Sequence, residues 1–160
     1  MTSWQDVERA APNLAAAARA RFDAHRHKVL ATLRADGSPR LSGIETTFKD
    51  GELWLGMMPD SRKALDLRRD PRLALHSPPV DPDLAEGDAR ITGRAVEITD
   101  PGAMTALVDG DERHAGEAPS GHVFRIDVTE VMVLKLGDPA DHLVIESWHE
   151  GRGLQRIERH

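Results

Sequence analysis

Two cations in the expected first turn of a short helix carry the most chemical information in this chain. An apolar run over 53–58 ends at Pro59, and Ser61 begins a helical pattern in which Arg62 and Lys63 come first. The free N–H groups and the positive dipole end of a helix start attract anions. Cations placed there oppose the dipole unless an anion lies between them. The pattern therefore predicts a phosphate site, and with it a phosphorylated cofactor.

The alternative interpretation is a solvated helix face with ion pairs to Asp60, Asp66 or Asp70, which contribute only ~0–1 kcal/mol. Charge-assisted hydrogen bonds to a phosphate contribute ~1.5–3 kcal/mol each. Micromolar affinity needs ~8 kcal/mol, and the entropy lost on binding must also be overcome. A phosphate alone is too weak an anchor, so the pattern favours a ligand in which a buried aromatic ring system supplies the rest.

The elements that must position these cations are short strands in hairpin spacing. The sequence predicts an N-terminal helix over 4–24 that is split at Pro12, a helix over 61–69, a short helix after Pro101 and a mobile loop over 109–121. The predicted strands cover 29–33, 40–48, 52–58, 72–76, 89–99, 123–136 and 143–148. Gly151 and Gly153 then punctuate an arginine-rich tail. Alternating βα units are absent, so we expect a mainly β (α+β) fold with six or seven antiparallel strands closed into a barrel.

Composition limits the classes of function. The chain has 160 residues and suits one domain, with a helical segment over 1–26 followed by the barrel over 27–160. A net charge of −6 argues against nucleic acid as a partner, and the lack of cysteine excludes thiolate chemistry. There is no apolar run of membrane-spanning length and no signal-peptide core, so we expect no membrane partner and a cytoplasmic location.

No metal site is expected. His25 and His27 have a spacing that could chelate an ion, but no third ligand is near them in the sequence. The acidic residues of 81–88 lack the glycine of a calcium loop and are interpreted as a solvated loop. The sequence indicates no catalytic acid, base or nucleophile.

The order of these pieces resembles the pyridoxamine 5′-phosphate oxidase-like, FMN-binding split-barrel superfamily, which includes deazaflavin (coenzyme F-420) reductases. The resemblance covers 27–98 and, more loosely, 122–159. The run Ser61–Ala64 is similar to the family's phosphate-binding Ser-Arg-Lys-Ala, and Asp70-Pro71-Arg72 follows at the usual distance. Residues 40–45 resemble the first cofactor strand, and 56–57 lie where the next strand approaches the ribityl phosphate. Trp148 and the run 156–159 resemble the tail of the oxidase branch, where a tryptophan and an arginine of the partner subunit close over the flavin.

The resemblance implies an oxidoreductase that transfers hydride between a flavin and a small organic substrate, as a homodimer with the cofactor at the subunit interface. The expected cofactor-binding residues are Arg40, Ser42, Gly43, Gly56, Met57, Ser61, Arg62, Lys63, Trp148, Arg156 and Arg159. Two departures argue against vitamin B6 oxidation itself. Glu45 stands where those oxidases carry a phosphate-binding lysine, and the tail reads Arg156-Ile157-Glu158 where they have Arg-Leu-His.

Three alternatives stay open. FMN is favoured by the Ser-Arg-Lys run, whereas F-420 would need a basic groove for its acidic tail, for which Arg68, Arg69 and Arg72 are candidates. A non-catalytic flavin carrier would bind the same cofactor without turnover. A haem-binding barrel would use His76 or His122 as the axial ligand.

Overall fold

Two short helices open the chain. α1 (Trp4–Ala10) begins at Ser3, whose side chain accepts a hydrogen bond from the Asp6 backbone N–H, while the Asp6 carboxylate accepts one from the Ser3 N–H. This reciprocal cap fixes the helix start. α2 (Pro12–Asp23) has Pro12 in its first turn, where the missing N–H is tolerated, and the predicted split at this proline is confirmed. The structure, a computed structural model, describes residues 1–108 and 120–160, so most of the loop predicted over 109–121 lies outside the described residues.

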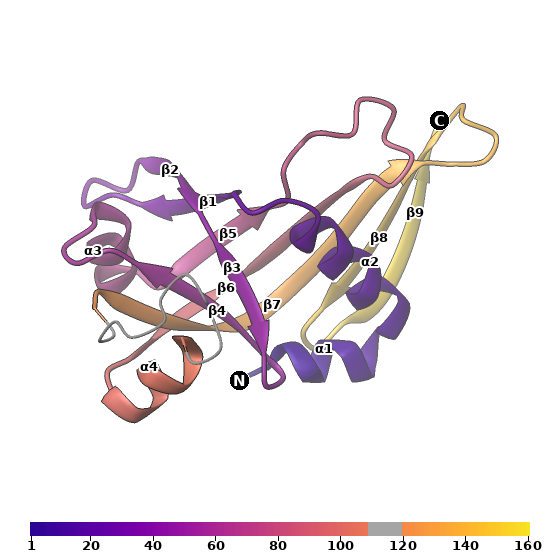
Figure 1. Cartoon of the computed structure of the whole chain (residues 1–160). Coiled ribbons are helices and arrows are strands. Elements are labelled where there is room, and N and C mark those ends of the chain that lie inside the picture. The colour runs from indigo at the N-terminus through magenta and orange to yellow at the C-terminus, as the bar shows by residue number, and fades with distance from the viewer. Residues whose placement is uncertain (109–119) are drawn as a thin grey trace.

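Nine strands form one antiparallel sheet along the path β2-β1-β5-β6-β7-β4-β3, with β8 added to β7 and β9 to β8 (Figure 1). The strands are β1 (Lys28–Leu33), β2 (Pro39–Ile44), β3 (Thr46–Lys49), β4 (Glu52–Met57), β5 (Arg72–His76), β6 (Asp88–Ile98), β7 (His122–Leu136), β8 (Leu143–His149) and β9 (Gly153–Arg159). α3 (Arg62–Arg69) follows β4 and α4 (Pro101–Val108) follows β6. The predicted mainly β, antiparallel class with interposed helices is confirmed.

The sheet is open, not closed as expected, and the chain passes from one end of the strand path to the other at Glu45. The continuous strand predicted over 40–48 is broken there into β2 and β3, which end the strand path on opposite sides. Because Glu45 alone separates β2 from β3, the sheet must curl to bring the two ends of the path close together. β2 and β3 do not pair with each other, so the barrel stays open between them. Arg26 Nε donates to Glu45 Oε1 at 2.5 Å at this break. The result is compatible with a split barrel.

β7 is the longest strand and connects the two halves of the sheet. It pairs with β6 on one side, and on the other with β4 over 122–125 and with β8 over 130–136. The register shifts between Thr92 and Gly93 of β6, where Thr129 of β7 has no opposite residue and forms a bulge. A Cβ on Gly93 would lie 2.4 Å from the Asp127 carbonyl oxygen, so only glycine fits this close approach.

β9 corrects the prediction of an irregular arginine-rich tail. Gly151 and Gly153, both with positive φ, form a tight turn that brings 153–159 back along β8. Only β8 pairs with β9 among the residues that the structure describes, and nearly every residue of β9 is exposed. An edge strand exposed on both faces lacks the apolar alternation that marks a strand in a sequence.

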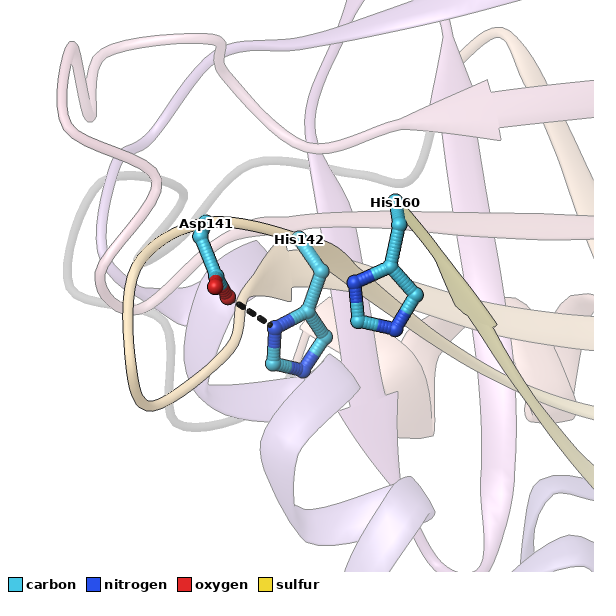
Figure 2. Close-up of side chains that lie close together, drawn as sticks. All are labelled: Asp141, His142 and His160. Atoms are coloured by element: carbon cyan, nitrogen blue, oxygen red, sulfur yellow. Dashed lines mark hydrogen bonds and ion pairs between the residues drawn. The ribbon is translucent and has the colours of Figure 1, made fainter.

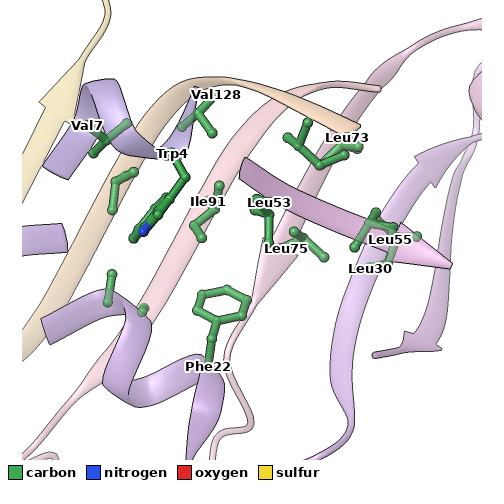
Figure 3. Close-up of a cluster of buried hydrophobic side chains, with 14 of the residues drawn as sticks. Trp4, Val7, Phe22, Leu30, Leu53, Leu55, Leu73, Leu75, Ile91 and Val128 are labelled. Carbon is green, nitrogen blue, oxygen red and sulfur yellow. The ribbon is translucent and has the colours of Figure 1, made fainter. Parts of the chain in front are cut away.

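One hydrophobic core joins the N-terminal helices to the sheet (Figure 3). Trp4 of α1 and Phe22 of α2 are almost fully buried, and both rings contact Phe48 of β3, with centroids 4.7 and 6.4 Å apart. Tertiary packing thereby stabilises two helices that are too short to be stable alone. Within the described residues, no helix has the length and apolar character to cross a membrane.

Candidate functional site

The predicted helix start lies where β4 ends. Asp60, with a positive φ of 56°, turns the chain, and Ser61 caps α3 by accepting a hydrogen bond from the Ala64 N–H at 3.4 Å. Arg62 and Lys63 then occupy the first turn, as predicted, and none of the residues of that turn is acidic. The remaining free N–H groups of the turn and the positive end of the helix dipole therefore face the same region as the two cations.

The two cations are held differently. Arg62 is exposed and makes no hydrogen bond or ion pair with any residue in the described parts of the chain. Lys63 is half-buried, and its Nζ donates to the carbonyl oxygen of Gly43 in β2 at 2.8 Å. The ion pairs of the alternative interpretation are not formed by Asp66 and Asp70, which bind other arginines. This leaves the positive charge of the first turn available to an anion.

Asp66 organises the face of α3 that packs on the sheet. Its side chain is only 4% exposed and accepts hydrogen bonds from Thr32 of β1 at 2.8 Å, from Arg40 of β2 at 2.7 Å and from Arg69 at 3.0 Å. Burial alone would raise the pKa of this carboxyl, but the three hydrogen bonds outweigh it and hold the pKa below its ordinary value. Arg40 is thus fixed beside α3 by a buried counter-charge.

Gly43 and Gly56 leave the backbone uncovered near this helix start. β2 approaches β4, and both glycines are exposed. A Cβ built on either one meets nothing within 4 Å, and neither residue needs a positive φ. The flat face of a ring can therefore approach both strands. The side chains of the two neighbouring predicted residues are less accessible to a ligand. Ser42 is half-buried, and Met57 is buried in the core, so Met57 can contact a ligand only through its backbone.

A second network fixes the other end of α3. Arg68 binds Glu97 of β6 through two hydrogen bonds of 2.8 and 2.7 Å, and these lower the pKa of the Glu97 carboxyl. His122 Nδ1 lies 3.3 Å from Glu97, while His122 Nε2 accepts from the Asp60 N–H at 3.1 Å. Both ring nitrogens therefore have partners, and the turn before α3 is tied to the start of β7.

Sequence reasoning did not identify Asp66, Thr32, Glu97 or His122 as supports of this site. Helical spacing points to Asp66 only as a partner of Arg62 and Lys63, because it shows near neighbours along the chain. Its actual partners Thr32 and Arg40 come from strands whose packing a single sequence does not reveal. The one available signal was a carboxylate on the apolar face of a short helix, next to Leu67.

Three of the expected site residues lie elsewhere. Trp148 is 7% exposed within the core cluster, where it stands between Val131 of β7 and Leu154 of β9. Arg156 is exposed and pairs with acidic neighbours on β8 and β9, and Arg159 is exposed near the chain end. Figure 1 shows β8 and β9 at the opposite end of the molecule from α3. One chain therefore brings together Arg40, Ser42, Gly43, Ser61, Arg62 and Lys63, with 56–57 on the strand that leads into α3, but not the tail residues.

A cavity of ≈ 920 Å³ also lies at the tail end. It is bounded by the loop 82–85, the end of β7, the turn 137–142 and the last residues of β9, including Arg156 and Glu158. It contains none of the residues around the start of α3.

Comparison with known proteins identifies the fold. The family model for pyridoxamine 5′-phosphate oxidase matches residues 14–135. A Clostridium acetobutylicum protein related to general stress protein 26, of the pyridoxinephosphate oxidase family, is 14% identical, with 88% of this chain and 89% of that chain covered and a TM-score of 0.58.

Two further structures are similar. The conserved hypothetical protein Rv2991 from Mycobacterium tuberculosis is 27% identical over 68% of this chain and 76% of that chain, with a TM-score of 0.58. An F420 reductase is 19% identical over 66% of this chain and 87% of that chain, with a TM-score of 0.51. No curated protein matches. The family model spans most of the chain, from α2 to the end of β7. The chain therefore belongs to the pyridoxamine 5′-phosphate oxidase-like split-barrel superfamily.

Proposed function

We propose that this protein is a flavin- or deazaflavin-dependent oxidoreductase that binds its cofactor at the start of α3. The observation that carries the proposal is the Ser61-capped turn, where Arg62 and Lys63 stand beside the open backbone of Gly43 and Gly56. The residues fit a phosphorylated tricycle: two cations and free N–H groups for the phosphate, and two side-chain-free positions for the ring. The bound cofactor would supply hydride transfer to or from a small organic substrate.

FMN is our first choice of cofactor. The arginines considered for the acidic tail of F-420 are each paired with a carboxylate: Arg68 with Glu97, Arg69 with Asp66, and Arg72 with Asp70 at 2.6 Å. Hydrogen bonds from Arg72 lower the pKa of Asp70 to about 2, so this pair stays charged at neutral pH. Less positive charge then remains for a polyanionic tail. The similarity to an F420 reductase keeps F-420 as the alternative.

We further propose that a second copy of the chain completes the site. Trp148, Arg156 and Arg159 cannot reach α3 of their own chain, because β8 and β9 lie at the other end of the sheet (Figure 1). Exposed apolar side chains on β2 and β9 offer surface for self-association: Leu41 is 74% exposed, Leu154 54% and Ile157 44%. In a two-fold dimer, the tail of each copy would close over the helix start of the other.

The haem alternative finds no support at His122. Both of its ring nitrogens are engaged, and its side chain is only 12% exposed. At His76, Nδ1 lies 2.5 Å from the Ser77 carbonyl oxygen, and Nε2 lies 4.0 Å from the carboxylate of Asp88.

Visible absorption spectra of the purified protein, repeated after addition of FMN and then of F-420, test the proposal. We expect FMN to bind with a shifted, structured flavin band and micromolar or tighter affinity, and the reduced complex to be reoxidised by a small organic acceptor. A Soret band, or no binding of either cofactor, would contradict the proposal. Binding without turnover against a panel of acceptors would reduce it to a flavin carrier.

The substitution Lys63→Ala is expected to weaken cofactor binding at least tenfold, about 1.4 kcal/mol, because it removes one charge-assisted contact. Arg62→Ala should act similarly. The matched control is Arg9→Ala, which removes an exposed arginine of α1 that forms an ion pair with Asp6. Circular dichroism should show all three variants folded. An unchanged dissociation constant in Lys63→Ala and Arg62→Ala would refute the site assignment.

A further inference from the structure

A cluster of potential metal ligands lies at the open end of the β7–β8–β9 part of the sheet. The carboxylate of Asp141 and the imidazoles of His142 and His160 have potential ligand atoms that all lie within 4.8 Å of one another (Figure 2). Among the residues that the structure describes, this is the single group of three such side chains that meets this distance. It is separate from the helix start that we assign to the cofactor.

Strand register explains why the two imidazoles meet. β8 and β9 pair from His149 opposite Gly153 to Leu143 opposite Arg159, so the next positions outward are His142 and His160. Residues directly opposite on antiparallel strands have Cβ atoms ≈ 4.5–5.5 Å apart and project to the same face. The two rings are stacked, with centroids 4.9 Å apart. Their approach therefore follows from the hairpin and needs no chance loop conformation.

His142 is held by its surroundings before any ion arrives. Its side chain is 10% exposed, and its backbone carbonyl accepts a hydrogen bond from the Gly137 N–H at 2.9 Å. The ring lies over Gly137, where a Cβ would be 2.2 Å from Nε2. The other nitrogen, Nδ1, is 2.8 Å from the Asp141 carboxylate. Only Asp141 and His160 need to move to complete a coordination sphere, and both are exposed.

We propose that Asp141, His142 and His160 bind one divalent transition-metal ion of the Zn²⁺ type. Two imidazoles and a carboxylate are ligands that this class of ion prefers, at bond lengths near 2.0–2.2 Å. Bonds of that length around a tetrahedral ion separate ligand atoms by roughly 3.3 Å. The 2.8 Å gap between Asp141 and His142 opens slightly, and His160 swings inward. The ion takes the place of the shared proton, and neutral His142 then carries its proton on Nε2.

The charges around the site favour a cation. His142 also borders the cavity of ≈ 920 Å³, and three carboxylates line that cavity, those of Asp83, Asp138 and Glu158. The cations Lys135 and Arg156 line it as well, and Arg156 is paired with Glu146 and Glu158. Among the described residues that line the cavity, Asp83 and Asp138 therefore face the single remaining cation Lys135. An ion here would tie the end of β9, an edge strand, to the turn between β7 and β8.

Calorimetric titration of the full chain with ZnCl₂ tests the proposal without any cofactor. We expect about one ion per chain with micromolar affinity. Co²⁺ in place of Zn²⁺ should give visible d–d absorption. Zinc should also raise the melting temperature, because it binds the folded chain.

Asp141 and His160 are exposed, so both can be replaced without disturbing the fold. His160→Gln and Asp141→Asn should each weaken zinc binding at least tenfold and remove most of the Co²⁺ spectrum while the fold is retained. His25→Gln, an exposed histidine outside the cluster, is the matched control and should bind as the parent does. Equal affinity in the parent chain and His160→Gln, a loss caused by His25→Gln instead, or no binding to the parent would each overturn the proposal.

Discussion

At the scale of single residues, a buried carboxylate does most to hold the candidate site in place. Asp66 links Thr32, Arg40 and Arg69, and so joins two strands to α3. Removing one partner of a buried charge cluster leaves the others without compensation. Under the proposed function, Asp66 would position the residues that contact the cofactor without touching the cofactor itself.

We expect Asp66→Asn to lower the free energy of unfolding by about 2 kcal/mol at pH 7, because the hydrogen bonds from two guanidinium groups lose their charge assistance. The folded-state pKa of Asp66 lies below its ordinary value, so the unfolded chain takes up the proton first as pH falls. This stabilisation is complete above pH ~4 and is lost as pH falls through the lowered pKa.

Urea unfolding at pH 7 and at pH 3 measures the effect. The difference between the parent chain and Asp66→Asn should shrink at the lower pH. Asp83→Asn, an exposed acid of the loop before β6, should change stability little at either pH. If Asp66→Asn shows the same pH dependence as the parent, the carboxylate is not the charged centre described above.

At the scale of elements, the glycines of β2 and β4 can be tested separately from the fold. Gly43→Leu and Gly56→Leu should leave the melting temperature nearly unchanged, because both positions are exposed and a Cβ meets nothing. The leucine side chain would occupy the space of the ring, so the FMN dissociation constant should rise at least tenfold. Thermal melts and absorption titrations measure the two quantities.

Gly93→Ala is the contrasting variant, because it should lower stability instead of leaving it unchanged. Its Cβ would collide with the Asp127 carbonyl oxygen, so stability should fall whether or not FMN is present. If Gly43→Leu and Gly56→Leu both bind FMN as tightly as the parent chain, the flavin ring does not lie on β2 and β4.

The same elements show what the sequence could and could not predict. The start of α3, the split at Pro12 and most strands follow from caps, proline chemistry and apolar alternation, which are local signals. The bend at Glu45 changes strand partners without interrupting alternation, so nothing local marks it. β9 carries no alternation at all, because both of its faces are exposed. The supports of α3 depend on pairings such as that of Arg68 with Glu97, 29 residues away.

At the scale of the whole molecule, the separation of α3 from β8 and β9 makes the shared-site proposal testable by complementation. In Lys63→Ala the helix half of the site is defective, and in Arg156→Ala the tail half is. Each variant alone should bind FMN weakly. When the two are unfolded together and refolded, half of the dimers should be mixed, each with one intact site, so about one quarter of all sites should bind FMN normally.

Stoichiometric FMN titration of the refolded mixture measures that fraction, and light scattering reports the oligomeric state. Refolding each variant by itself is the control. A monomer in solution, or a mixture that binds no better than its components, would rule out a site built from two copies.

The position of β7 between β4 and β8 has a consequence for how this scaffold can vary. β4, which leads into α3, pairs with β7 over 122–125, and β8 pairs with β7 over 130–136. The length of β7 between these two segments therefore sets the distance from α3 to the β8–β9 hairpin. Each residue added between these segments lengthens it by about 3.3 Å. A single insertion would also turn every following side chain to the wrong face, whereas a pair of residues would keep the faces and only displace the hairpin. Insertions or deletions of two residues in β7 are therefore the smallest changes that can move the β8–β9 hairpin relative to α3 while keeping every side chain on its face of the sheet.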